Sequence, residues 1–265
     1  MRVLVLGSAG FIGSAIAAEA ARLGHEVVGV GRERYAAFVG TACDILVNAC
    51  GNARKYLDER DPVAGYEKSV SSTLRALRDF HYGVFVQISS GAVYPREDSP
   101  AENSEDIRLA PPLPTLYGFH KWMAEQLVLQ HAPRHVILRI GGAVGPGLRK
   151  NPVYDLLAGA PLYVHPDSRF QFIDSRDAAR AVFDLCARES SGGRIYNLCG
   201  RGTVSVRQVA RWAGKDIPPD AESLPRVCAE LNLAKVAAGW DLPSTEDSVR
   251  RFIREVQAGE IVLPQ

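Results

Sequence analysis

Two side chains that could exchange a proton stand four residues apart in the segment YGFHK. Tyr117 and Lys121 fall in the stretch 115–129, which is predicted to be helical, so both should project from one face of the helix. An unperturbed tyrosine titrates at roughly 10, too high for proton exchange at neutral pH. A nearby ammonium favours the phenolate and lowers that pKa, which makes Tyr117 a candidate general acid/base. Because YxxxK often occurs by chance, the interpretation of this motif depends on the elements around it.

A hydroxyl stands at the end of a predicted strand. The segment VFVQISS favours a buried strand over 84–89, and Ser90 follows it directly. Ligands gather at the carboxyl ends of strands in parallel sheets. Ser90 is therefore a second candidate catalytic residue.

Three glycines form a turn near the start of the chain. Gly7, Gly10 and Gly13 stand in GSAGFIG, between an apolar run typical of a buried strand (2–6) and a predicted helix (13–23). Such a turn lets a dinucleotide pyrophosphate rest on backbone N–H groups at a helix N-terminus. The spacing is one residue wider than GxGxxG, but its place after the first strand favours nucleotide binding over a merely tight turn.

The end of the second predicted strand (26–30) bears on the choice of dinucleotide. NAD enzymes typically carry a carboxylate there, which binds the ribose hydroxyls. Gly31 stands at that place and Arg32 follows, which removes repulsion toward a 2′-phosphate and supplies a guanidinium to hold it. The sequence favours NADP over NAD. The alternative is that Arg32 and Arg34 are solvated loop charges.

The remaining pattern indicates a doubly wound parallel α/β sheet with a small C-terminal lobe. Predicted strands at 45–49, 84–89 and 136–140 alternate with predicted helices at 62–80 and 115–129. Only about a dozen residues separate the second strand from Ile45, so one outer strand is expected to be missing. Ser205 and Gln208 stand in capping-box register at the start of a helix over 205–213. The predicted dinucleotide-binding domain spans 1–145 with 171–200 returning to it, and the substrate lobe spans 146–170 and 201–265.

Composition restricts the partners. The 265 residues include 31 basic and 30 acidic side chains, a formal charge of +1, which disfavours nucleic acid as a partner. The first apolar run is too short for a signal or a membrane span, so we expect a cytoplasmic protein with no membrane partner. The five cysteines contain no CxxC and are expected to be reduced and mostly buried. Pro133 separates the histidine pair His131 and His135, and no metal site is predicted.

Together these motifs resemble the extended short-chain dehydrogenase/reductases, which include the NAD-dependent epimerase/dehydratase family acting on nucleotide sugars. The glycine turn, SSGAVY and YGFHK stand in the family's order and spacing, and LRIGGAVGPG, FQFIDSRDAARA and YNLCGRGTVSV are similar to its later segments. The resemblance implies a Rossmann fold and a C-terminal lobe that holds a sugar or nucleotide-sugar substrate. It also implies a homodimer formed through the helix that carries Tyr117 and the helix before it.

The resemblance also implies roles for particular residues. Tyr117 would exchange a proton during nicotinamide-dependent hydride transfer, Ser90 would hydrogen-bond the substrate oxygen, and Lys121 would hold the cofactor ribose. Contacts with the cofactor are expected from Gly7, Ser8, Gly10, Phe11, Ile12, Gly13, Arg32, Ala49, Cys50, Gly51, Ser89, Tyr117 and Lys121. Contacts with the substrate are expected from Gly91, Ala92, Arg149 and Arg169. Arg149 and Arg169, like Lys150 and Arg201, could equally be surface charges.

The chain departs from the family's pattern at several substrate positions. Gly91 and Ala92 replace the Asp-Glu pair of the dehydratases, which argues against 4,6-dehydration. Ala92 and Gly147 replace the Cys and His of the epimerase-reductases, which argues against 3,5-epimerisation. Phe170 stands where the family places a phosphate-binding arginine, with Arg169 one residue off register.

Three functions are consistent with these residues. The leading hypothesis is an NADP-dependent ketoreductase acting on a keto group of a sugar or nucleotide sugar, with Tyr117 as general acid. The alternative is a 4-epimerase that retains NAD. A less favoured hypothesis from another class is an NADP-sensing module that has lost catalysis, although such a module has no need of Tyr117 and Lys121 together.

Overall fold

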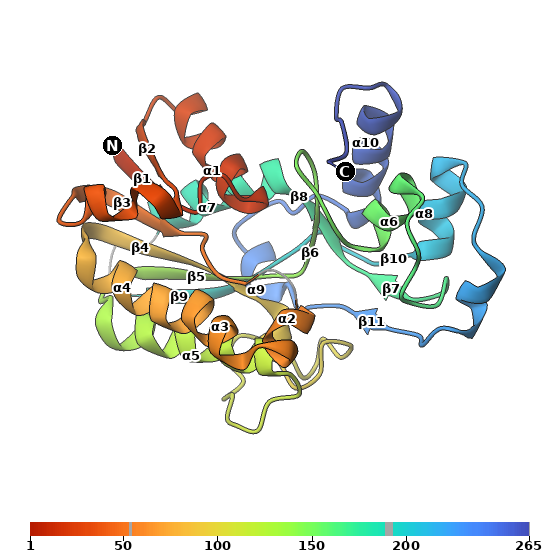
Figure 1. Ribbon diagram of the computed structural model, residues 1–265, viewed down its shortest axis with the longest axis horizontal. Helices are drawn as coiled ribbons and strands as arrows, with labels where there is room; N and C mark the ends of the chain where they lie inside the picture. The colour runs from red at the N-terminus through yellow and green to blue at the C-terminus, as the bar shows by residue number, and fades with distance from the viewer. Residues whose placement is uncertain (53–54, 189–192, 265) are drawn as a thin grey trace. The chain divides into compact units, whose positions relative to one another are not determined.

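The computed structural model describes residues 1–52, 55–188 and 193–264 (Figure 1). The chain forms two compact units. The first comprises Met1–Pro95, Glu105–Ile140 and Ala179–Tyr196, and the second Arg96–Ser104, Gly141–Ala178 and Asn197–Gln265. The functional division into a cofactor domain and a substrate lobe stays a prediction. Its boundaries differ from those of the units at 96–104, 141–145, 171–178 and 197–200, which were predicted in the cofactor domain and lie in the second unit.

A six-stranded sheet forms the centre of the first unit. Its strands are β1 (Arg2–Leu6), β2 (Glu26–Val30), β3 (Ala42–Asn48), β4 (His81–Ser90), β5 (His135–Ile140) and β9 (Gly193–Leu198). They lie in the order β2-β1-β3-β4-β5-β9, and β1–β2, β1–β3, β3–β4 and β4–β5 pair in parallel. This order confirms the doubly wound α/β fold, whose winding direction reverses between β1 and β3.

The predicted gap at the outer edge of the sheet is confirmed. A 3₁₀ helix, Arg32–Phe38, is the only helix or strand between β2 and β3. β2 is therefore the edge strand. The carboxyl ends of β1, β3 and β4 lie together at one edge of the sheet, where the predicted site residues follow them.

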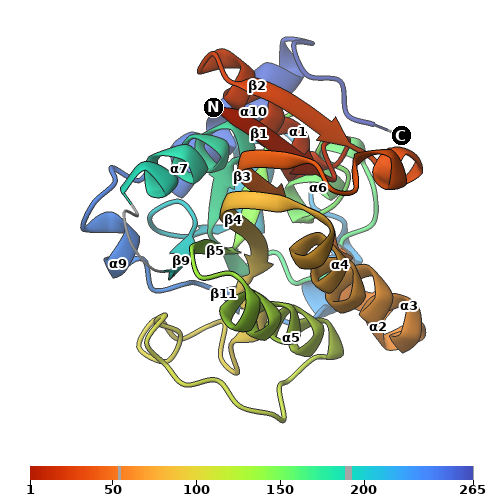
Figure 2. The ribbon, with the colours of Figure 1, turned by 90° about the vertical axis from the view of Figure 1, so that its left-hand side faces the viewer.

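Helices cover both faces of this sheet. α1 (Phe11–Arg22) and α7 (Ser175–Arg188) lie on one face, and α4 (Ser72–Asp79) and α5 (Leu116–His131) lie on the other, near the short α2 (Lys55–Arg60) and α3 (Pro62–Tyr66) (Figures 1 and 2). Alternate strand residues and one side of α4 and α5 share a buried core that includes Leu4, Leu6, Leu46, Phe85, Ile137, Leu77, Phe80 and Val128. This core fixes α5 against the sheet.

The helix predicted over 62–80 is interrupted, so that prediction is wrong in detail. A π-helical turn, Glu67–Ser71, separates α3 from α4. The hydroxyls of Ser72 and Thr73 donate to carbonyls four residues back, at 2.6 and 2.7 Å, and such bonds bend helices. Turns of this kind are frequent at functional sites, and this one carries Ser69.

The described residues of the second unit form two small sheets and four complete α-helices. β6 (Gly142–Val144) pairs with β8 (Phe172–Asp174), and β7 (Arg169–Phe170) lies between β10 (Val204–Ser205) and β11 (Cys228–Ala229). The helices are α6 (Pro152–Ala158), α8 (Val206–Ala213), α9 (Ala234–Ala237) and α10 (Thr245–Gln257). The capping box of α8 is confirmed, because Ser205 Oγ accepts from Gln208 N at 3.1 Å and Gln208 Oε1 accepts from Ser205 N at 2.8 Å.

None of the five cysteines forms a disulfide bond, but the expectation that most are buried is wrong. Cys186 and Cys199 are buried, Cys43 and Cys50 are partly exposed, and Cys228 is exposed because β11 is an edge strand. Within the described ranges, no helix combines the length and apolar character of a membrane span.

Candidate active site

The glycine turn connects β1 to α1 and packs against the residues that follow β3. Gly7 has φ +77°, and a Cβ on it would lie 2.9 Å from Ala49 O. A Cβ on Gly13 would lie 2.2 Å from Gly7 O, so the first turn of α1 approaches the loop more closely than a side chain permits. Gly10 N donates to Gly7 O at 2.9 Å. The sequence motif therefore makes the close turn that a bound phosphate requires.

The N-terminus of α1 fits an anion. Gly10 is its N-cap residue and contributes no side-chain hydrogen bond, and the first turn holds no acidic residue. The backbone N–H groups of Phe11, Ile12 and Gly13 are first-turn donors, which have no partner within a helix. Together with the positive end of the helix dipole, they can receive a pyrophosphate.

The loops after β2 and β3 approach each other beside this turn. Arg32 is exposed and begins the 3₁₀ helix, and its charge acts on the thiol of Cys50. Burial raises the pKa of Cys50, against the opposing effect of Lys121 and Arg32, so the thiol is neutral at pH 7. Ser8 lies against Gly29 of β2, since a Cβ on Gly29 would be 2.8 Å from Ser8 Oγ.

Tyr117 and Lys121 are adjacent in the first turns of α5. Lys121 Nζ lies 5.9 Å from the centroid of the Tyr117 ring, and both side chains are largely buried. Thr115 caps the helix by accepting from Gly118 N at 3.0 Å, and Glu59 accepts from Leu116 N at 2.9 Å. The side chains of Tyr117 and Lys121 project from one face of the helix, as predicted.

Gly118 brings the start of α5 against the segment that follows β4. A Cβ on Gly118 would lie only 2.0 Å from Ala92 O, so no larger residue fits without movement. Ser90 Oγ accepts from Ala92 N at 3.2 Å. The same short segment, Gly91–Val93, thus contacts the helix that carries Tyr117 and holds the hydroxyl of Ser90.

Lys121 also faces the loop after β3. A Cβ on Gly51, whose φ is +124°, would lie 2.9 Å from Lys121 Nζ, and the same Nζ donates to Ile88 O at 3.4 Å. Burial lowers the pKa of the Lys121 ammonium, while the negative charge of Asp58 works to raise it. Gly51 and Cys50, two of the residues predicted to contact the cofactor, therefore border the lysine.

Ser89 has a different use from Ser90. Its hydroxyl donates to Glu125 Oε1 at 2.5 Å, within a buried group that contains Arg139 and Tyr94. Arg139 donates to both oxygens of Glu125 and, at 2.8 Å, to Tyr94 Oη. This leaves only the main chain of Ser89 for the predicted cofactor contact.

Sequence reasoning missed two buried polar residues near Lys121. Asp58 and His120 are 0% and 3% exposed, and His120 Nδ1 lies 2.9 Å from Asp58 Oδ2. The one signal was the place of His120 directly before Lys121 in YGFHK. Nothing in the sequence marks Asp58, which lies 62 positions away.

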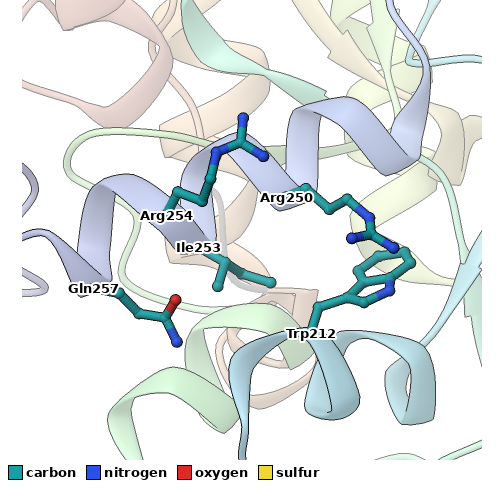
Figure 3. Close-up of a pocket in the computed structure, with 5 residues that line it drawn as sticks. All are labelled: Trp212, Arg250, Ile253, Arg254 and Gln257. Atoms are coloured by element: carbon teal, nitrogen blue, oxygen red, sulfur yellow. The ribbon is translucent and has the colours of Figure 1, made fainter.

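The predicted substrate arginines belong to the second unit. Arg149 is exposed, whereas the guanidinium of exposed Arg169 donates to Thr203 Oγ1 at 2.9 Å and Thr203 O at 3.1 Å. Arg201 lines a hollow of about 300 Å³ beside Ser244 at the start of α10. A second hollow, of about 110 Å³, lies between α8 and α10, where the Arg250 guanidinium is 4.4 Å from the Trp212 ring centroid. Figure 3 shows the side chains that line it. Neither hollow contains a residue from the predicted catalytic set.

A protein-family model decides the family. The model described as the NAD dependent epimerase/dehydratase family matches residues 3–199, about three-quarters of the chain. The chain belongs to this family. The match includes the glycine turn, Ser90, Tyr117 and Lys121, so the resemblance inferred from the motifs is confirmed. No curated protein matches the chain in sequence at a significant level.

Solved structures of similar fold include epimerases and a reductase. A UDP-galactose 4-epimerase is 22% identical with a TM-score of 0.80, covering 98% of this chain and 99% of its own. MoeE5 in complex with UDP-glucuronic acid and NAD is 19% identical with a TM-score of 0.79, covering 98% and 100%. The dTDP-4-dehydrorhamnose reductase of Bacillus anthracis in complex with NADP is 16% identical with a TM-score of 0.77, covering 96% and 98%. At these identities the likeness establishes the fold of this family member.

Proposed function

We propose that this protein is an NADP-dependent ketoreductase that acts on a keto group of a sugar or nucleotide sugar. The observation that carries the proposal is the buried pair of Tyr117 and Lys121, with the ammonium 5.9 Å from the phenol ring. A sensor of dinucleotides would need only the glycine turn. The pair supports catalysis because a lysine ammonium stabilises the phenolate that a proton-donating tyrosine leaves behind.

The chain's own residues supply binding and proton transfer. The first turn of α1 would hold the pyrophosphate, and Lys121 would hold the nicotinamide ribose. When bound, the reduced nicotinamide would supply the hydride to the carbonyl carbon. Tyr117 would give its hydroxyl proton to the carbonyl oxygen. Ser90 Oγ accepts from Ala92 N, which leaves its hydrogen to be donated to the same oxygen.

The residues after Ser90 favour simple reduction over water loss. Gly91 and Ala92 are buried and carry no acid or base. Removal of water from a sugar needs a second proton donor and acceptor at the ring, and neither position offers one. A 4-epimerase that retains NAD stays the alternative, because one similar structure is named a UDP-galactose 4-epimerase and another, MoeE5, is in complex with NAD.

The direct assay is NADPH consumption with a panel of 4-keto sugars and 4-keto sugar nucleotides. We expect a steady loss of NADPH absorbance with at least one member of the panel. Interconversion of 4-epimers by protein that carries NAD, without net consumption of NADPH, would establish the epimerase instead. If no keto sugar in the panel led to NADPH consumption, the reductase hypothesis would be rejected.

Arg32→Ala is expected to weaken NADPH binding about tenfold or more and to change NADH binding little, because only NADPH carries the 2′-phosphate. Isothermal titration of the two dinucleotides measures both dissociation constants. Arg34→Ala is the matched control, since the Arg34 guanidinium lies over the Phe38 ring at 5.1 Å. Equal losses for NADPH and NADH in Arg32→Ala would contradict the assignment.

A further inference from the structure

Both ends of the short segment that carries Ser90 are tied to one buried ion pair. Glu125 of α5 and Arg139 of β5 are 0% and 3% exposed, and the guanidinium donates to both carboxylate oxygens. At one end of the segment, Ser89 Oγ donates to Glu125 Oε1 at 2.5 Å. At the other end, Tyr94 Oη accepts from Arg139 Nη1 at 2.8 Å. These four bonded side chains are called the Glu125–Arg139 group below.

The group leaves its members little freedom. Ser89 and Arg139 are partners in the register between β4 and β5, so their side chains lie on the same face of the sheet. The guanidinium also lies 4.8 Å from the centroid of the Tyr94 ring, which is buried. Pro95 favours the extended backbone that Tyr94 has, with φ −82° and ψ 143°. Each buried side-chain nitrogen and oxygen of the group has a hydrogen-bond partner, and a fully satisfied buried network is rigid.

The same group continues the side of α5 that holds the proposed catalytic residues. Tyr117, Lys121 and Glu125 stand at intervals of four, so they share one side of the helix, and all three are buried. We call this side the tyrosine–lysine face. It contacts successive residues of β4, because Lys121 Nζ donates to Ile88 O at 3.4 Å and Glu125 accepts from Ser89. Glu125 therefore fixes the end of β4 against the turn of α5 that follows the lysine.

The need for a fixed direction explains why charges occupy this place. Apolar side chains of similar volume often stabilise a core as well as a buried ion pair does, because removing charges from water is costly. Charged hydrogen bonds add a defined geometry. Between the two anchors stand Ser90, Gly91, Ala92 and Val93, of which only Val93 has a large apolar side chain. The anchors at the two ends therefore determine where the Ser90 hydroxyl lies.

We propose that the Glu125–Arg139 group positions Ser90 relative to the tyrosine–lysine face of α5. Ser89 and Tyr94 anchor the two ends of the segment, and each acts through Ser90. They are positioning residues. The hydrogen bond from Ser90 to a substrate oxygen rests on the proposed function, whereas the place of the hydroxyl between its two anchors does not.

Amide hydrogen exchange of the dinucleotide-free protein tests the positioning without turnover. Ala92 N donates to Ser90 Oγ at 3.2 Å, so its exchange rate reports how firmly that hydroxyl is held. Tyr94→Phe keeps the ring beside Arg139 and removes one anchoring hydroxyl, and Ser89→Ala removes the other. Each variant is expected to raise the Ala92 exchange rate about tenfold, while amides at the centre of β3 exchange as before. An unchanged Ala92 rate in either variant, or an equal rise in β3, would overturn the proposal.

Tyr35→Phe is the matched control. Tyr35 Oη donates to Asp79 Oδ2 at 3.0 Å, so this variant also removes a hydroxyl that is bonded to a charged side chain. The Tyr35 ring packs edge-on against Phe80 at the end of α4, with centroids 5.4 Å apart. The Ala92 amide should exchange at the same rate in this variant as in the unmodified protein.

A double-mutant cycle in the ketoreductase assay tests the catalytic consequence. Tyr94→Phe is expected to lower kcat about 10- to 100-fold with little change in KM, because a small displacement of Ser90 disturbs the reacting geometry. In a protein that already carries Ser90→Ala, the same change should have little further effect, since the residue it acts through is gone. Equal effects in both backgrounds would overturn action through Ser90. If Ala92 exchange rises as expected but no keto sugar is reduced, the positioning stands and the proposed function fails.

Discussion

Tyr117→Phe is expected to lower kcat by roughly 100- to 10,000-fold, the usual contribution of a positioned general acid. The substitution removes one hydroxyl and keeps the ring that lies 5.9 Å from Lys121 Nζ. Packing of α5 should therefore survive, and dinucleotide affinity should change far less than kcat. Steady-state turnover and dinucleotide titration on the same preparation measure both effects.

Tyr82→Phe is the matched control for that variant. Tyr82 stands at the amino end of β4, opposite the end that carries Ser90, and its ring contacts Phe85 at 5.1 Å. Loss of its hydroxyl should leave kcat unchanged. If Tyr117→Phe kept full activity and cellular function while Gly10→Val abolished function, the sensing module would replace the enzyme as the best account.

Glu125→Gln is expected to destabilise the protein by about 3–5 kcal/mol, the cost of removing one partner of a buried ion pair. Glu125 and Arg139 are 0% and 3% exposed, and Glu125 accepts from Arg139 and Ser89 at once. A neutral amide leaves the Arg139 charge buried and uncompensated. Urea unfolding followed by circular dichroism gives the free energy of unfolding of each variant.

Glu246→Gln provides the comparison for an exposed pair. Glu246 accepts from Arg250 at 2.7 Å on the surface of α10. Because solvent screens such pairs, its loss should cost about 1 kcal/mol or less. Equal costs at the two positions would show that the buried pair of Glu125 and Arg139 adds no more stability than an exposed pair.

The centre of the sheet was predictable because its strands are buried on both faces. Continuous Val, Leu and Ile runs have few other solutions, and β1 begins and ends where the sequence predicts. The missing outer strand followed from chain length alone. The π-helical turn at Glu67–Ser71 did not, because it depends on serine and threonine hydroxyls that bond to the backbone locally.

The candidate site was predictable where a local pattern carries the chemistry. The glycine turn and the i, i+4 pair of Tyr117 and Lys121 each occupy one short segment. Asp58 and His120 come from segments 62 positions apart, and only the packing of α2 against α5 brings them together. The contact between Asp58 and His120 is therefore a property of the folded chain that no local pattern predicts.

Transfer of deuterium from NADPH that carries deuterium at both hydrogen positions of nicotinamide C4 tests the central claim most directly. The protein is incubated with labelled NADPH and the keto sugar that supports NADPH consumption. The molecular mass of the sugar product is then measured by mass spectrometry. A ketoreductase gives an alcohol with one deuterium for each NADP⁺ formed. The Tyr117→Phe variant forms almost no labelled alcohol in the same time. A product without deuterium, or a 4-epimer formed without NADP⁺, would contradict the account.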